Sequence, residues 1–104
     1  MSTYTPDTWV VLEFDYDGDV IRKVFAGWYG GFAAGDAWKL SSGITETKDF
    51  EDRYEFLNES GSLYICHKNG YGMSGYQSSI YSTWIDVIEK SDTATMKLIE
   101  EYNV

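Results

Sequence analysis

Cysteine and histidine are almost missing from this 104-residue sequence, which contains one of each, Cys66 and His67. A single cysteine cannot form a disulfide within the chain, and no second cysteine is present to complete a cysteine-based zinc site. The two residues are neighbours in a segment that we interpret as a strand, where successive side chains point to opposite faces. Unless a bulge interrupts that strand, they can neither share a metal ion nor act as a nucleophile and its base. We therefore predict no catalytic residue, no metal site and no cofactor.

Long apolar runs are also missing. No run in the sequence approaches the ~18 residues of a membrane-spanning helix. The first residues, MSTYTPDTW, lack the charged and apolar regions of a signal peptide. We therefore expect a cytoplasmic protein in a reducing compartment, with no membrane partner.

Positive charge is scarce, because the sequence contains 8 Lys and Arg residues and 17 Asp and Glu residues, which gives a net charge of −9. Direct binding to nucleic acid requires clustered Lys and Arg, so we expect none. The charge permits a basic protein partner or an acidic mimic of nucleic acid, and it also fits a role in solubility alone.

Asp15, Asp17 and Asp19 alternate as in a calcium loop, but the central Gly and closing Glu are not at the required spacing. We interpret them as a solvated turn.

Alternating apolar and polar residues indicate strands in the first two thirds of the chain. After a short polar lead at residues 1–7, every second residue from Val10 to Tyr16 is apolar, which predicts a half-buried strand over Trp9–Tyr16. Asp17-Gly18 has the composition of a tight turn, and Val20–Trp28 follows as the second strand of a hairpin. Further strands are expected at Ala37–Ser42, Ile44–Lys48, Arg53–Leu57 and Leu63–His67.

Helical periodicity begins at Ser74. This residue can cap a helix, and Gln77 three residues later completes a capping-box pattern. Apolar residues then recur at three- and four-residue steps to about Lys90. Asp92 is a plausible cap for a short last helix, whose apolar positions would be Met96, Leu98, Ile99 and Tyr102.

The predicted fold class is α+β in a single domain spanning residues 1–104. We expect a curled antiparallel sheet or small barrel of about five strands, over residues of about 9–67. An amphipathic helix and a short last helix should follow, over residues of about 74–102.

Two loops rich in glycine and aromatic residues are the candidate binding sites, at residues 27–36 and 67–76. Glycine lets the backbone approach a partner closely, and tyrosine offers both a flat face and a hydroxyl. The helix start at Ser74 presents N–H groups that favour an anion. The alternative is a wide loop between strands and a strand-to-helix connection, with rings that pack internally. The candidate residues are Trp28, Tyr29, Phe32, Lys68, Asn69, Tyr71, Met73, Ser74 and Tyr76.

Three segments, GWYGGF, GDAWKLSSGI and SGSLYICHKNGYGMSGY, occur in an order that resembles small uncharacterised accessory proteins of tailed bacteriophages. The resemblance covers residues of about 9–85 and contains no catalytic motif. It implies a cytoplasmic protein made in an infected bacterium. Such proteins inhibit a host enzyme or a defence system, by binding a protein or by sequestering a nucleotide signal.

The function that we expect is therefore a non-enzymatic, phage-type binding protein that inhibits or modulates a bacterial host or defence protein, with a basic partner favoured by the charge. One alternative is a binder that sequesters an anionic nucleotide with the two loops. Others are an acidic nucleic-acid mimic and an enzyme. An unpaired sheet edge would also permit a homodimer.

Overall fold

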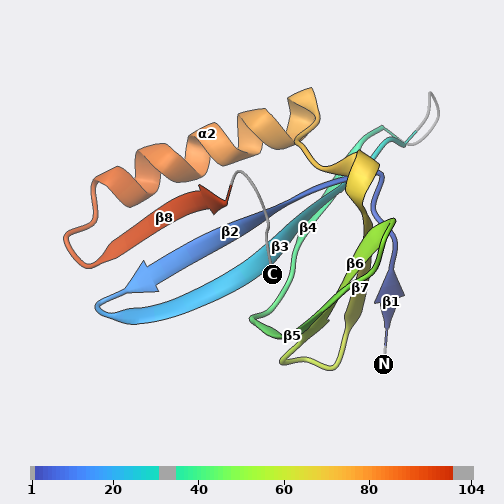
Figure 1. The fold of residues 1–104 in the computed structure, drawn as a ribbon. Helices are drawn as coiled ribbons and strands as arrows, with labels where there is room; N and C mark the ends of the chain where they lie inside the picture. The colour runs from blue at the N-terminus through green and yellow to red at the C-terminus, as the bar shows by residue number, and fades with distance from the viewer. Residues whose placement is uncertain (1, 31–34, 100–104) are drawn as a thin grey trace.

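The computed structural model describes residues 2–30 and 35–99 as three layers, in which a helix and two four-stranded sheets follow one another (Figure 1). The elements are β1 (Thr3–Tyr4), β2 (Thr8–Tyr16), β3 (Asp19–Trp28), β4 (Ala37–Leu40), β5 (Ile44–Asp49), β6 (Arg53–Asn58), β7 (Leu63–His67), the short 3-10 helix η1 (Lys68–Gly70), α2 (Gly75–Glu89) and β8 (Ala94–Ile99). The middle sheet has the strand order β4-β3-β2-β8, and the outer sheet has the order β1-β7-β6-β5. The predicted α+β class is confirmed.

The hairpin of β2 and β3 forms the centre of the middle sheet. Its pairing runs without a break from Thr8 opposite Gly27 to Tyr16 opposite Asp19. Asp17 and Gly18 both have positive φ, 53° and 96°, as a two-residue turn with the twist of the flanking strands requires. The predicted hairpin and its turn are confirmed.

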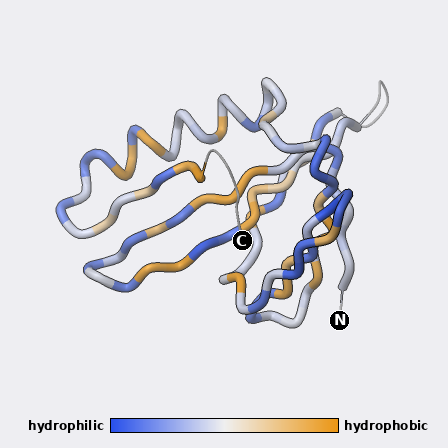
Figure 2. The backbone as a smooth tube through the Cα atoms, viewed as in Figure 1, coloured by the Kyte–Doolittle hydropathy of each residue, from blue (hydrophilic) through white to orange (hydrophobic). Residues whose placement is uncertain are grey.

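Both faces of β2 are buried, and this corrects the expectation of a half-buried strand. Trp9 and Val11 pack with residues of the outer sheet, such as Phe56. Val10 and Leu12 point the other way, toward the helix side. Figure 2 shows apolar stretches along the two central strands. A strand between two layers has apolar residues on both faces, so the alternation expected for a solvent-facing sheet does not apply to it.

The prediction of one curled sheet or barrel of about five strands is wrong, because the described residues form eight strands in two separate sheets. Ser41 directly follows β4, at the point where the chain leaves the middle sheet for the outer sheet. Its backbone N–H donates to the Val24 carbonyl at 2.9 Å, while its hydroxyl, in place of a backbone carbonyl, accepts from the Val24 N–H at 2.8 Å. The chain can therefore leave the middle sheet without an unpaired buried N–H group at Val24.

The outer sheet contains the remaining predicted strands and one that the prediction missed. β5, β6 and β7 pair antiparallel in sequence order, close to the predicted bounds. The polar lead contains β1, which pairs parallel with β7 through Thr3 opposite Leu63 and Tyr4 opposite Tyr64. A two-residue strand has too little periodicity to detect in the sequence.

The long helix is confirmed as α2, and its predicted capping box is present. The Ser74 hydroxyl accepts from the Gln77 N–H at 3.1 Å, and the Gln77 side-chain oxygen accepts from the Ser74 N–H at 3.0 Å. The same buried amide accepts a hydrogen bond from the Thr8 hydroxyl and donates to the Phe25 carbonyl at 3.2 Å. Gln77 therefore joins the helix start to both central strands. A Cβ at Gly27 would lie 2.3 Å from the Gln77 side-chain oxygen, so glycine is needed for this approach.

The predicted last helix is wrong, because Ala94–Ile99 forms β8 along the free edge of β2. Met96 and Leu98 are half-buried and alternate with exposed Thr95 and Lys97, which is the period of a strand. The turn before β8 is closed by Ser91, whose hydroxyl accepts from the N–H groups of the residues that follow it. Tyr102 lies outside the described residues. Of the helices in the described part of the chain, none is long and apolar enough to cross a membrane.

Replacing Gln77 with Leu should lower the free energy of unfolding by about 2–3 kcal/mol, because the capping box is lost and the Phe25 carbonyl is left without its donor. Urea unfolding followed by circular dichroism would measure the change. Ser82→Ala, at an exposed position of the same helix, is the control and should change stability by less than about 0.5 kcal/mol. Equal stability of Gln77→Leu and Ser82→Ala would contradict this role.

Candidate functional site

The predicted loop at residues 67–76 is held by its own side chains. The Tyr71 ring lies edge-on to the Trp9 ring, with a centroid distance of 5.1 Å, and its hydroxyl donates to the Ile99 carbonyl. Met73 packs against the helix-side core, and Ser74 is the helix cap. These side chains contribute to the fold. Asn69 and Tyr76 are exposed.

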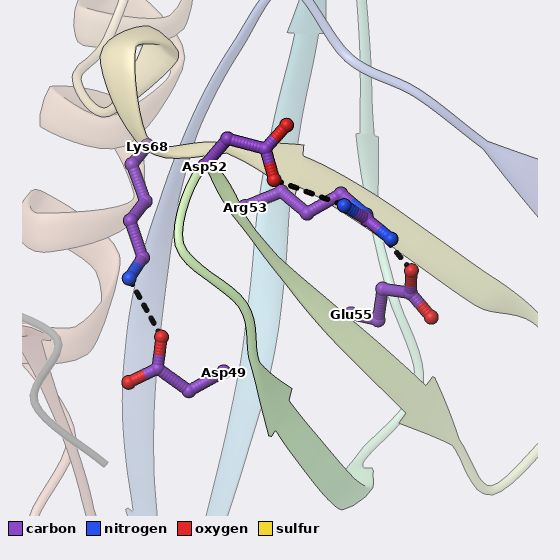
Figure 3. Close-up of polar contacts among 5 residues, drawn as sticks. All are labelled: Asp49, Asp52, Arg53, Glu55 and Lys68. Carbon is purple, nitrogen blue, oxygen red and sulfur yellow. Dashed lines mark hydrogen bonds and ion pairs between the residues drawn. The ribbon is translucent and has the colours of Figure 1, made fainter.

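Lys68 belongs to a group of ion pairs beside this loop (Figure 3). Its ammonium lies 2.6 Å from the Asp49 carboxylate, and this hydrogen bond raises the pKa of Lys68. Arg53 contacts Asp52 and Glu55, each at 2.9 Å, and its hydrogen bond lowers the pKa of Asp52. Both cations are already paired with carboxylates, so an incoming anion would have to compete with these contacts.

The structure describes part of the predicted loop at residues 27–36, namely residues 27–30 and 35–36. Trp28 is half-buried, and its indole N–H donates to the Thr5 carbonyl at 3.1 Å while its ring meets the Tyr4 ring edge-on. Tyr29 is 59% exposed, and its backbone N–H donates to the Asp7 carboxylate at 2.9 Å. Phe32 lies outside the described residues. The structure brings the described part of this loop and the helix start together at one end of the molecule (Figure 1).

Cys66 and His67 point to opposite sides of β7, as predicted. Cys66 is buried in the core between the sheets, and burial raises the pKa of its thiol. His67 is exposed, and its backbone carbonyl accepts the Trp9 indole N–H at 2.7 Å. Because the thiolate is the reactive form, we expect burial to slow the reactions of Cys66 in the folded protein.

We expect the Cys66 thiol to react with a disulfide reagent at least about a hundredfold more slowly in the folded protein than in urea. Absorbance of the released thiolate would follow the reaction. A Ser82→Cys variant, with its added thiol on the exposed face of α2, should release one fast equivalent while Cys66 stays protected. Fast reaction of Cys66 without denaturant would show that this core is open.

Among the described residues, a groove between α2 and β4 is lined entirely by apolar and aromatic side chains. It encloses about 320 Å³ and is lined by Phe14, Leu40, Trp84, Val87 and Ile88. We call it the apolar groove. All of its lining side chains are hydrocarbon or aromatic, so it offers shape and apolar surface but no titratable group.

The apolar groove exists because one helix cannot cover four strands. A helix with its side chains is about 10 Å wide, whereas four strands spaced about 4.8 Å apart place the outermost strands about 14 Å from each other. α2 lies along β8, at the opposite edge of the sheet from β4 (Figure 1). Trp84 reaches back across the sheet, with its ring centroid 4.9 Å from that of Phe25 and 5.2 Å from that of Trp38.

Two large apolar side chains at the rim of the apolar groove are exposed to solvent. Val87 is 64% exposed and Trp38 is 39% exposed. The sequence pattern places Trp38 and Leu40 on one face of a strand and Val87 on the apolar face of the helix, and it does not show whether these side chains are covered. No sequence signal shows that α2 lies at the β8 edge, so the groove was not predicted.

Comparison with protein families, with curated proteins and with solved structures finds no match to this chain. The functional argument therefore depends on the surface chemistry.

Proposed function

We propose that this chain is a non-enzymatic accessory protein of the phage type that inhibits or modulates a bacterial protein by binding to it in the cytoplasm. The observation that carries the proposal is the apolar groove, with the exposed Val87 and Trp38 on its rim. Aromatic side chains in an apolar depression are the usual anchors of protein interfaces.

The chemistry of the apolar groove favours a protein over a nucleotide. The phosphates of a nucleotide need cations or several N–H donors, whereas the lining side chains include no cation and only one N–H donor, the indole of Trp84. At the helix start, the Gln77 N–H is already bonded to the Ser74 hydroxyl. Apolar side chains of a partner, by contrast, would bury the surface that Val87 and Trp38 expose to water.

The net charge of −9 supports a basic partner. Opposite charge raises the rate at which two proteins meet, while apolar contact determines how long they stay together. Inhibition follows if the complex covers a surface that the partner needs for its own work.

Val87→Asp should abolish partner binding without unfolding the protein, because it would place an unpaired carboxylate in a dry contact. Tagged wild-type and variant proteins would be incubated with bacterial lysate and washed in about 0.1 M and about 0.5 M NaCl. Mass spectrometry would then identify and quantify the bound material. We expect the wild type to retain one protein at both salt concentrations and Val87→Asp to retain at least about tenfold less.

Val20→Asp is the matched control. Val20 is 57% exposed, close to the value for Val87, and lies on β3 outside the apolar groove. This variant should bind as the wild type does, and circular dichroism should show both variants folded. Equal capture by Val87→Asp, a protein held only at low salt, or a bound nucleotide with no protein would each overturn the proposal.

A further inference from the structure

We infer that the partner binds as an added strand: an extended segment of a basic protein pairs with the free edge of β4 and inserts alternate apolar side chains into the apolar groove. The inference rests on the proposed function and specifies its geometry and the chemistry of its partner.

The backbone of β4 offers hydrogen-bonding groups on its free edge. β4 pairs only with β3 in the described sheet, in the register Phe25 opposite Leu40 and Gly27 opposite Trp38. The Ser41 N–H donates to the Val24 carbonyl, so the hydrogen-bonded pairs are Val24 with Ser41 and, two residues on, Ala26 with Lys39. Trp38 and Leu40 therefore turn their backbone N–H and C=O groups away from β3.

This edge is accessible from solvent. Three of its four residues, Ala37 to Lys39, are exposed, and Leu40 is half-buried. An exposed edge with unpaired N–H and C=O groups is a template for another strand. A segment of a few residues is enough to use the groups of Trp38 and Leu40.

The side chains of β4 place the apolar groove under such a strand. Trp38 and Leu40 lie on the face that is turned to α2, where Leu40 lines the groove and Trp38 contacts Trp84. Side chains of an added strand alternate between faces, so every second one would lie on the same face as Leu40, which lines the groove, and next to Trp38 on its rim. Backbone pairing would supply affinity, and the groove would select apolar residues at alternate positions.

The free edge of β5 lacks this combination. β5, at the edge of the outer sheet, presents the exposed polar residues Thr45, Glu46 and Lys48. The hollow beside it is lined by Val20, Arg22, Ile44, Thr45, Glu46 and Thr47, and thus includes two charged residues. An apolar side chain would gain less there than in the apolar groove.

Charge identifies the occupant as a basic segment of another protein. Asp36, Asp86 and Glu89 are exposed next to β4 and the groove, and the Glu59 carboxylate lies close to Gly43, just beyond β4. Three lysines also lie nearby, at positions 23, 39 and 90, and they offset these local negative charges. The negative electrostatic potential that would attract a basic segment therefore depends on the net charge of the whole chain, −9. A second copy of this chain would bring like charges together, whereas Lys and Arg between the apolar residues of a partner would be attracted.

The test is a selection from a displayed random library of peptides of about nine residues. The wild type, Val87→Asp and Val20→Asp would each be used as bait. We expect the wild type and Val20→Asp to enrich the same peptides, with apolar residues at every second position and an excess of Lys and Arg between them. Val87→Asp should not enrich them.

The enriched peptide would then be made in three forms: unmodified, and with N-methyl groups on the amides of every second residue in each of the two possible alternations. Strand pairing requires the amides on one side only. We therefore expect one of the two methylated peptides to bind at least about tenfold more weakly and the other to bind like the parent. Fluorescence of Trp38 and Trp84 would report binding, and affinity should fall as salt rises.

Several outcomes would overturn strand addition: no enrichment over Val87→Asp, apolar residues at helical spacing, an excess of acidic residues, or equal binding of both methylated peptides. If lysate capture still depended on Val87 in that case, the proposed function would stand and only its geometry would fall. If capture did not depend on Val87 either, both proposals would fall.

Discussion

Burial of the β2–β3 hairpin on both faces is the constraint on which the rest of this structure depends. Trp9 and Val11 on one side, and Val10 and Leu12 on the other, are removed from water only if each face has its own cover. The outer sheet covers one face, and α2 covers the other. Removal of either layer would expose the most apolar part of the chain, so the layers must fold as one unit.

The two covers differ in how completely they fit. The outer sheet meets the hairpin with large rings, including Tyr54 and Phe56 around Trp9, and encloses the only cysteine. The helix is narrower than the sheet that it covers, and Gln77 fixes its start over the central strands. The uncovered strip along β4 is therefore a consequence of the architecture, and Trp38 and Val87 make that strip apolar.

Local patterns in the sequence predicted local structure well. The strand over Trp9–Tyr16, the Asp17-Gly18 turn and the Ser74–Gln77 capping box each depend on neighbours in the chain, and each is confirmed, although the strand is buried on both faces rather than on one. The errors have a common cause, which is pairing between distant segments. Residues 94–99 become a strand because the edge of β2 is free to receive them, and the chain divides into two sheets at Ser41.

The candidate site was harder to predict for the same reason. Exposed and buried rings are alike in the sequence, so Tyr71, whose ring packs on Trp9, was grouped with the exposed Tyr29 as a binding residue. Trp38 was placed on one face of an expected strand, and nothing in the sequence shows that α2 leaves this side chain 39% exposed. Whether Trp38 is covered or exposed depends on where α2 lies across the sheet.

The most direct measurement of the central claim is hydrogen exchange, by NMR, of the β4 amides in the free protein and in its complex with a selected peptide. In the free protein, the Lys39 amide should exchange slowly because it is bonded to β3, while those of Trp38 and Leu40 should exchange quickly. Binding should protect Trp38 and Leu40. Protection that appeared instead on β5 or at residues 67–76, with β4 unchanged, would contradict the account.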